Sequence, residues 1–443
     1  MLTDPRGNPV TAASAESVAR LEATIEAYCE LSKDTGDRLK AALAGDPKLV
    51  MAHILRGYFM LLFVKRELLP RAQQAVEAAD KVIRQTGATP REVLHRQALG
   101  AWIARDEIRA IESLRAILVD YPRDIVALKL AQYLLFYAGD WIGMRDIVAG
   151  AIASWDESLP CYSFALGCHA FGLEECGDYA AAERAGRRAV ALNPKDIWGA
   201  HAVTHVYEMQ DRTEEGLAWI GTLAPYWGDT NNFAFHVWWH RCLFLIALRR
   251  FDEALERYDR EVRAESTDEY LDITNAVALL WRLEQQGVNV GTRWRELGER
   301  AASRSADHMM VFGDAHYAMA LAASGSAGDF ACWEESARAH SAQSHETQAL
   351  ILSEVGIALG EAARAHREGA FARALDLLLP IRHAIRRIGG SHAQRDLFTQ
   401  LLIDSAVKAG RHEIARDLLR DRLATRPKNT WALNELRLIE GRG

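Results

Sequence analysis

Apolar residues recur along this chain at the three- and four-residue spacing of an amphipathic helix, from Ala15 to the C-terminal end. Alternating strand patterns are almost absent, whereas Ala, Leu, Arg and Glu, which favour helices, are frequent. The pattern therefore predicts an all-α protein. Residues 1–15 do not follow this spacing, and we expect them to form an extended N-terminal arm.

A longer period of about 34 residues runs through the helical pattern. The stretch 163–194 shows it best, with a Gly-Asp-Tyr turn, a small residue (Ala182) shortly afterwards and a closing Asn-Pro. A small residue lets two antiparallel helices approach closely, and a proline can begin the next helix without losing a needed donor. The small residue recurs after four further turns, at Ala110, Ala254, Ala374 and Ala415.

This pattern resembles the tetratricopeptide repeat, whose antiparallel helix pairs stack into a right-handed superhelix. At that period the chain would hold roughly eleven to thirteen helix pairs. No stretch has the composition of an interdomain linker. We therefore predict a tetratricopeptide-like α-solenoid that forms one continuous superhelix over residues 1–443.

Composition and charge narrow the range of partners. The 443 residues are 49% hydrophobic and 26% charged, as in soluble folded proteins, and the six cysteines form no C-x-x-C pair. The net charge of -7, with scattered Lys and Arg, offers no basic surface to nucleic acid. The N-terminus lacks an export signal, and apolar runs fall short of the roughly 20 residues of a membrane span. We expect a cytoplasmic monomer or homodimer without nucleic-acid or membrane partners.

The densest group of histidines lies between residues 193 and 240, which hold four of the fifteen in the chain. His201 and His205 are four residues apart, as are His236 and His240. On helices each pair would share one face, roughly 5–6 Å apart at Cβ. Repeats starting at residues 197 and 235 would carry the two pairs on their first helices.

First-helix positions resemble those that line the concave groove of tetratricopeptide arrays, where ligands bind. Neighbouring first helices pack about 8–10 Å apart, so imidazoles from both could converge on one ion or substrate. The residues expected at or beside this groove are His201, His205, Glu208, His236, Trp239 and His240.

These residues permit three interpretations. The two histidine pairs, together with Glu208, could bind a divalent metal, for which zinc is the default choice. They could instead form a polar ligand pocket without metal. They could also simply hydrogen-bond within a packed core, because H-x-x-x-H lacks the glutamate of H-E-x-x-H. Trp239 could likewise fill the core or form an apolar pocket wall.

Further polar residues that are unusual for a packing seam occur later in the chain. The segment S-H-A-Q-R-D follows two glycines at 389–390 and opens a helix. Ser391 suits a helix cap, whereas an Arg-Asp pair can hold a carboxylate-bearing ligand or brace the turn. We expect a tight superhelix to bring such residues to one cavity with the histidines. The candidate ligand-binding residues are His201, Trp239, His240, Asp272, Asn275, His316, His392, Gln394, Arg395 and Asp396.

Several segments resemble a narrower group, the tetratricopeptide repeat protein 38 family, whose members run nearly this length. They are D-P-R-G-N-P-V-T-A-A-S-A-E at 4–16, H-A-V-T-H-V-Y-E-M at 201–209, F-H-V-W-W-H at 235–240, Y-L-D-I-T-N-A at 270–276 and I-G-G-S-H-A-Q-R-D at 388–396. The resemblance covers essentially the whole chain. It implies a helical-repeat fold and cytoplasmic character, and it supplies no reaction or catalytic residues.

Two functional classes stay open. One is a histidine-rich pocket for a small polar or carboxylate-bearing ligand. If the pocket is catalytic, His205, His236 and Glu208 would carry His- or metal-assisted hydrolase or lyase chemistry. The other is a non-catalytic scaffold that binds a partner peptide in its groove. The cluster of four histidines favours the pocket, because a scaffold does not need it.

Overall fold

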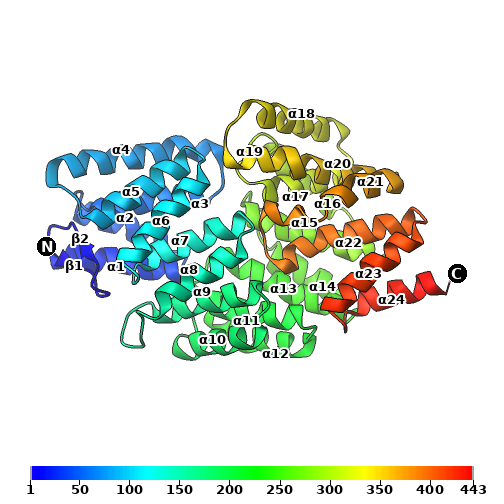
Figure 1. The fold of residues 1–443 in the computed structure, drawn as a ribbon, viewed down its shortest axis with the longest axis horizontal. Helices are drawn as coiled ribbons and strands as arrows, with labels where there is room; N and C mark the ends of the chain where they lie inside the picture. Colours follow the sequence, from blue (N-terminus) through cyan, green and yellow to red (C-terminus); the bar gives the residue numbers. More distant parts are fainter. Residues whose placement is uncertain (1, 442–443) are drawn as a thin grey trace. The chain divides into compact units, whose positions relative to one another are not determined.

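The chain is almost entirely helical in the computed structural model, which describes residues 2–441 (Figure 1). The strands named in that part are two residues long: β1 (Leu2–Thr3) pairs antiparallel with β2 (Pro9–Val10). The prediction of an all-α fold is confirmed. Helices that follow one another in the chain pack together as antiparallel pairs, for example α9 (Tyr162–Glu175) and α10 (Tyr179–Leu192). None of the described helices has both the length and the apolar character to cross a membrane.

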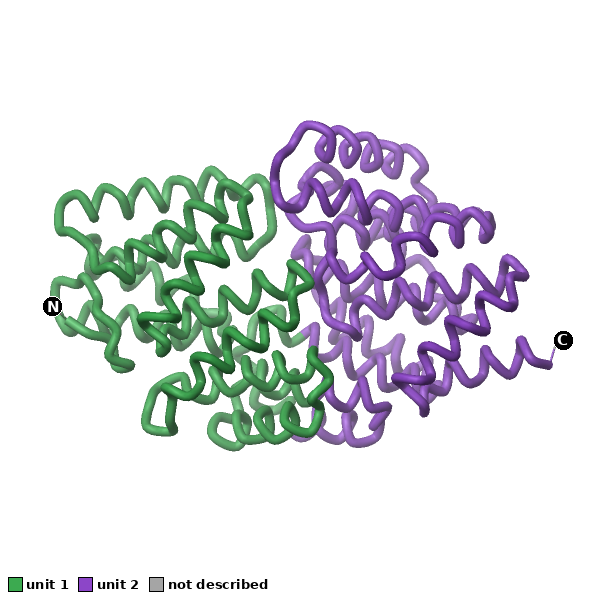
Figure 2. Tube along the Cα trace, viewed as in Figure 1, with its two compact units in different colours: residues 1–203, 223–234 green, residues 204–222, 235–443 purple. Residues whose placement is uncertain are grey.

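The chain divides into two compact units, coloured separately in Figure 2. Unit 1 comprises residues 1–203 and 223–234, and unit 2 comprises residues 204–222 and 235–443. Helices α11 (Ile197–Met209) and α13 (Phe233–Ala247) run without interruption through two of the points where the chain passes from one unit to the other. The single right-handed superhelix over the whole chain stays a prediction.

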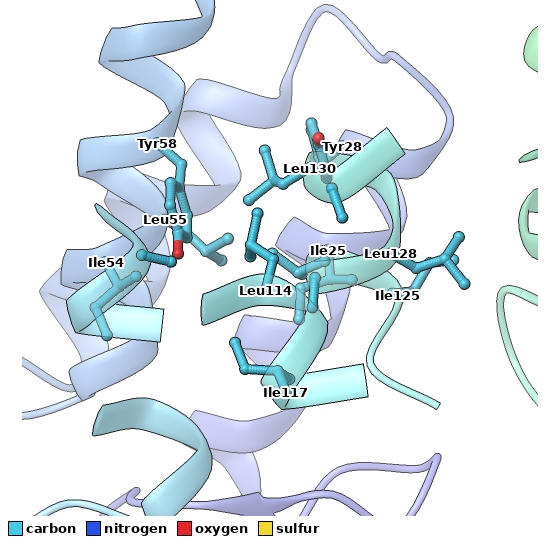
Figure 3. Close-up of a cluster of buried hydrophobic side chains, with 14 of the residues drawn as sticks. Ile25, Tyr28, Ile54, Leu55, Tyr58, Leu114, Ile117, Ile125, Leu128 and Leu130 are labelled. Carbon is cyan, nitrogen blue, oxygen red and sulfur yellow. The ribbon is translucent and has the colours of Figure 1, made fainter. Parts of the chain in front are cut away.

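Unit 1 is built around an apolar core to which consecutive helix pairs contribute. Leu55, Leu114 and Ile125 come from three different helices and are fully buried in it (Figure 3). Besides α9 and α10, the helices of this unit are α1 (Ala15–Cys29), α2 (Thr35–Gly45), α3 (Val50–Leu62), η1 (Arg66–Leu68), α4 (Leu69–Thr86), α5 (Pro90–Ile103), α6 (Glu107–Asp120), α7 (Ile125–Tyr137), α8 (Trp141–Ile152) and η2 (Ala224–Tyr226).

The predicted N-terminal arm forms a small hairpin that is held by charged groups. The Asp4 carboxylate accepts hydrogen bonds from the backbone amides of Arg6 and Asn8, at 2.9 and 2.8 Å. The Arg6 guanidinium lies 2.7 Å from a carboxylate oxygen of Glu22 on α1. All four residues are buried. Pairing of charges therefore packs a segment that has no helical spacing of its own.

Unit 2 continues the same construction, with two stretches of π-helix and one proline within a helix. The π-helical stretches are η3 (Tyr258–Val262) and η4 (Leu352–Gly356), and Pro380 lies inside α21. The other helices of this unit are α12 (Thr213–Leu223), α14 (Phe251–Arg257), α15 (Tyr270–Gln285), α16 (Arg293–Ser303), α17 (Val311–Ser324), α18 (Ala327–Gln343), α19 (Thr347–Ile351), α20 (Ile357–Arg367), α21 (Phe371–Ile381), η5 (Ile385–Ile388), α22 (His392–Lys408), α23 (His412–Thr425) and α24 (Thr430–Glu440).

The repeated turn seen in the sequence has a clear structural role. Gly177 adopts a left-handed φ of 83°, and the Asp178 side chain caps α10 by accepting from the backbone amide of Ala181 at 3.2 Å. One turn into the helix, Ala182 is fully buried at 0% exposure. The other small residues of the pattern are also fully buried, with 0% exposure: Ala110, Ala254, Ala374 and Ala415. They occupy the closely packed positions that the sequence predicts for them.

The turn before α22 is fixed by two glycines and a capping box. Gly389 and Gly390 have φ values of 80° and 84°, and a Cβ at Gly390 would lie 2.6 Å from the ring of Phe312. The Ser391 hydroxyl accepts from the Gln394 amide at 3.2 Å, while the Ser391 amide donates to the Gln394 side chain at 2.9 Å. Ser391 is thus the predicted N-cap, and Gln394 closes the cap.

Candidate metal centre

The clustered histidines come from two helices, α11 and α13. Each of His201, His205, His236 and His240 offers one ring nitrogen, and these four atoms all lie within 4.8 Å of one another. The four side chains are buried, with exposures between 0% and 3%. The i, i+4 spacing predicted this grouping, and the grouping could hold a metal ion.

Three of these histidines, His205, His236 and His240, belong to unit 2. The His240 ring makes edge-on contacts with both of the others, at centroid distances of 4.4 Å to His205 and 4.9 Å to His236. A set of three imidazoles is one of the common protein ligand sets of catalytic zinc.

His201 precedes His205 by one turn of the continuous helix α11, so both lie on the same helix face. The ring of His201 packs against three aromatic side chains of unit 1, Phe171, Trp198 and Phe233, at centroid distances of 5.1–5.4 Å. These aromatic neighbours restrict the rotation of the imidazole.

Burial keeps two histidines of the cluster, His205 and His236, neutral near pH 7. It lowers the pKa of His205 well below the usual value, and the nearby His236, His392 and Arg395 lower it further. Burial also lowers the pKa of His236 to about 4, although its hydrogen bond to Asn275 acts in the opposite direction. Metals bind the neutral imidazole, so these two side chains need not lose a proton before they coordinate an ion.

Asn275 of α15 orients His236. The Nδ1 atom of His236 lies 2.9 Å from the side-chain oxygen of Asn275. An amide oxygen can only accept, so Nδ1 carries the proton and Nε2 presents its lone pair. Support of this kind from a neighbouring side chain is typical of histidine ligands. Asn275 is therefore placed as a supporting residue.

Two buried N–H donors beside His236 lack hydrogen-bond partners among residues 2–441. One is the indole nitrogen of Trp239, whose ring stacks on His236 at 5.3 Å and 14°. The other is the side-chain nitrogen of Asn275. Buried donors are nearly always paired in folded proteins, so both mark positions where an acceptor atom of a ligand would be stabilised.

Arg282 also lies beside this cluster, although the sequence interpretation did not include it. Its guanidinium carbon is 5.6 Å from the centroid of the Trp239 ring. It follows Asn275 by seven residues on α15 and therefore shares a helix face with Asn275 and Asp272. Arg282 is also the single charged residue in the run A-V-A-L-L-W-R-L at 276–283. This isolated charge and the spacing from Asn275 are the signals in the sequence that could have identified Arg282.

Glu208 is not part of the histidine group. Its carboxylate lies 3.4 Å from the guanidinium of Arg426, which also donates to the Glu208 backbone carbonyl at 2.7 Å. Burial raises the pKa of Glu208, and the nearby Asp396 and Asp211 raise it further, against the effect of Arg426. To act as a base or a metal ligand at the histidines, as predicted, Glu208 would have to leave this pair.

Arg395 and Asp396, adjacent in the sequence, pair with different partners and not with each other. Asp396 binds Arg422 of α23 through both carboxylate oxygens, one of them at 2.8 Å. Burial would raise the pKa of Asp396, but Arg422 outweighs it and holds the pKa below its usual range. Arg395 instead donates to the Gly390 carbonyl and lies 3.3 Å from Nδ1 of the half-buried His392. These contacts match the bracing of the turn, one of the two roles that the sequence left open, and the ligand-binding role of Arg395 stays a prediction.

His316 and Asp272 have their own hydrogen-bond partners in unit 2. Nδ1 of His316 donates to the Phe312 carbonyl at 2.8 Å, and burial lowers the pKa of His316 to about 4. The Asp272 carboxylate accepts from the Thr267 hydroxyl at 2.5 Å. Of the further candidates, Asn275 and Trp239 make contacts with His236 in the structure, by a hydrogen bond and by ring stacking.

Comparisons with known proteins do not supply a function for this chain. No sequence profile of a known protein family matches this chain. A solved structure titled "Structure of Naa15/Naa10 bound to HypK-THB" contains a similar chain, with 12% sequence identity and a TM-score of 0.26. The alignment covers 97% of the present chain and 66% of the other chain, so the present chain spans just under two thirds of its length. The protein is a helical-repeat protein with a buried histidine group.

Proposed function

We propose that this protein binds a divalent metal ion, zinc, through His205, His236 and His240, with His201 beside them in the same group of ring nitrogens. We further propose that the centre binds a small polar or carboxylate-bearing molecule in the cytoplasm. The observation that carries the proposal is the group of four ring nitrogens within 4.8 Å of one another. Imidazole nitrogens bind zinc at about 2.0–2.1 Å, so small movements of the side chains would complete the site.

Three features of unit 2 support a ligand site over simple core packing. Burial keeps His205 and His236 in the neutral form that coordinates metals. The hydrogen bond from His236 to Asn275 leaves Nε2 as the coordinating atom. The indole N–H of Trp239 and the amide N–H of Asn275 lack acceptors among the described residues, as expected where a ligand supplies them.

The number of histidines that coordinate the ion would decide its role. With three imidazole ligands a tetrahedral ion keeps one position for substrate, and this suits hydrolase or lyase chemistry on a small molecule. With all four imidazoles the site would be closed and structural. A metal-free pocket, with His205 or His236 as general base, is the enzymatic alternative.

A peptide-binding scaffold is the non-enzymatic alternative. Its peptide would need exposed side chains along the first helices. His205, Trp239 and His240 are instead at 0% exposure, and this favours an ion or a small molecule. We also propose that the chain belongs to the tetratricopeptide repeat protein 38 family. The segments at 201–209, 235–240 and 388–396 support this assignment.

The metal content of the full chain, purified without a histidine tag, tests the proposal. We expect about one zinc ion per chain by elemental analysis, bound at the four-histidine group. The double variant His205→Ala/His236→Ala should lose the metal, whereas the exposed His383→Ala control should retain it. A wild-type protein without stoichiometric metal after growth with added zinc would refute the metal centre. So would a double variant with unchanged metal content.

A further inference from the structure

Arg282 is a buried cation in an apolar stretch of helix. Arg282 is only 4% exposed, and its neighbours Leu280, Trp281 and Leu283 on α15 are buried as well. Removing a guanidinium from water is costly unless an anion or several hydrogen bonds compensate. The partners of Arg282 therefore determine what else its charge requires.

The hydrogen bonds of Arg282 go to neutral carbonyl groups. The guanidinium donates to the carbonyl of Ala278 at 3.0 Å and to that of Ala393 at 2.8 Å. Each of the two terminal nitrogens of the guanidinium thus donates to a backbone carbonyl, which carries no negative charge. No carboxylate of residues 2–441 forms an ion pair with it.

The two carboxylates that act electrostatically on Arg282, Asp396 and Glu208, are paired with other arginines. Asp396 binds Arg422 through both of its oxygens, and Glu208 lies against Arg426. Burial lowers the pKa of Arg282 to about 10, and the nearby Arg422 and Arg426 act in the same direction, although Asp396 and Glu208 favour the charged form. The folded protein therefore retains a cation whose burial is only partly compensated.

Arg282 also faces the part of the histidine cluster that has spare donors. Its guanidinium carbon lies 5.6 Å from the centroid of the Trp239 ring, which in turn stacks on His236. The indole N–H of Trp239 and the amide N–H of Asn275 are the two unpartnered donors described above. Arg282 thus places a cation next to the ring of Trp239, whose N–H, like that of Asn275, lacks an acceptor among the described residues.

We propose that Arg282 anchors an anionic group, a carboxylate or a phosphate, of the small molecule that binds at the histidine cluster. This inference rests on the proposed function. Both groups are planar or branched oxygen acceptors that match the paired N–H donors of a guanidinium. The ligand class is then a small anion, with the anchored group next to Trp239 and its remaining atoms toward His236. Arg282 replaces Arg395 as the anchoring residue, because Arg395 is held by the turn at Gly390.

Binding of two simple anions to the full-length, zinc-loaded protein tests this assignment. Inorganic phosphate and succinate would be titrated separately by calorimetry at constant ionic strength, so that the two arms distinguish phosphate from carboxylate. The variants are Arg282→Met, which removes the charge, and Arg282→Lys, which keeps the charge and removes the paired donors. Arg295→Met serves as the control, because the Arg295 side chain is 85% exposed.

The wild-type chain should bind at least one of the two anions. Arg282→Met should weaken that binding about tenfold or more, as expected for the loss of a charge-assisted hydrogen bond. Arg282→Lys should weaken it to a smaller extent, and Arg295→Met should leave it unchanged. If Arg282→Met does not fold, as judged by circular dichroism, Arg282→Lys decides, and unchanged affinity in that variant would contradict the anchor.

Equal affinity in wild type and Arg282→Met, or failure of the wild type to bind either anion, would overturn the inference. Zinc content, measured on the same samples, separates this outcome from failure of the metal centre. Arg282→Met should retain the metal of the wild type, because Arg282 is not among the grouped nitrogen ligands. A metal-free wild type that still binds anions through Arg282 would refute the metal centre alone.

Discussion

Asn275 shows how one side chain can determine the chemistry of a neighbouring histidine. Its oxygen accepts the Nδ1 proton of His236 at 2.9 Å and thereby directs Nε2 to the ion. We expect Asn275→Ala to lower zinc affinity by about 10- to 100-fold, the usual effect of removing a residue that supports a metal ligand. Competition with a chromophoric chelator would measure the change.

The exposed Asn289→Ala variant is the matched control and should bind zinc like the wild type. Equal zinc affinity in Asn275→Ala and Asn289→Ala would mean that His236 does not need this hydrogen bond, and it would weaken the assignment of His236 as a ligand.

His316, which is outside the proposed ligand set, tests how strongly burial lowers the pKa of a histidine in this protein. Its pKa falls from 6.5 to about 4 on folding. The unfolded chain therefore binds more protons between these values, so stability is complete above pH 6.5 and decreases as the pH falls toward 4. The full effect is on the order of 3 kcal/mol.

Replacement His316→Gln keeps a donor for the Phe312 carbonyl and removes the titrating group. Urea unfolding of this variant at about pH 7 and about pH 4.5 should show a smaller loss of stability than the wild type, because one depressed pKa is removed. His383→Gln, at an exposed position, should behave like the wild type. An unchanged pH dependence in His316→Gln would contradict the depressed pKa.

At the scale of the helices, small residues set how closely a pair can pack. Ala182 and Ala415 are at 0% exposure. We expect Ala182→Leu and Ala415→Leu each to cost roughly 1–3 kcal/mol of unfolding free energy, because the added atoms overpack the helix pair. Thermal and denaturant unfolding would measure the loss.

Ala180 is exposed on the same helix as Ala182 and provides the control. Ala180→Leu should change the free energy of unfolding by less than about 0.5 kcal/mol. A similar result at positions 180 and 182 would show that the assignment of the packed face is wrong.

The turn before α22 combines backbone strain with close packing. A side chain at Gly390 would meet a positive φ of 84° and the ring of Phe312, whereas Gly410, with a φ of 70°, has open space around it. Gly410→Ala should therefore cost roughly 1–2 kcal/mol from the backbone alone. Gly390→Ala should cost roughly 1–3 kcal/mol more, because it also overpacks the Phe312 ring. Equal losses in the two variants, measured by urea unfolding, would mean that Phe312 moves aside without cost.

The helices could be predicted from the sequence because their signal is local. Periodic apolar residues, the Gly-Asp turn at 177–178 and the capping serine at 391 each act within one or two turns of the chain. The N-terminal hairpin could not be predicted in this way. Its packing depends on the pairing of Arg6 with Glu22, which lies sixteen residues away on another element.

For the molecule as a whole, the histidine site was predictable only in part. The i, i+4 pairs placed the histidines correctly, because a helix fixes that spacing. The partners of the acidic residues were not predictable, because Asp396 binds an arginine 26 residues later and Glu208 contacts one 218 residues later. Arg282 could not be identified from the sequence for a related reason. Its proposed role as an anion anchor depends on its having no carboxylate partner among the described residues, and only the folded chain shows this.

A crystal structure of the full-length, untagged protein, with diffraction data on both sides of the zinc absorption edge, tests the central claim most directly. We predict one anomalous peak at about 2.0–2.1 Å from ring nitrogens of His205, His236 and His240. A contact of the same length to His201 would identify a closed, structural site. The absence of any peak at these imidazoles, in crystals grown with zinc, would contradict the metal centre.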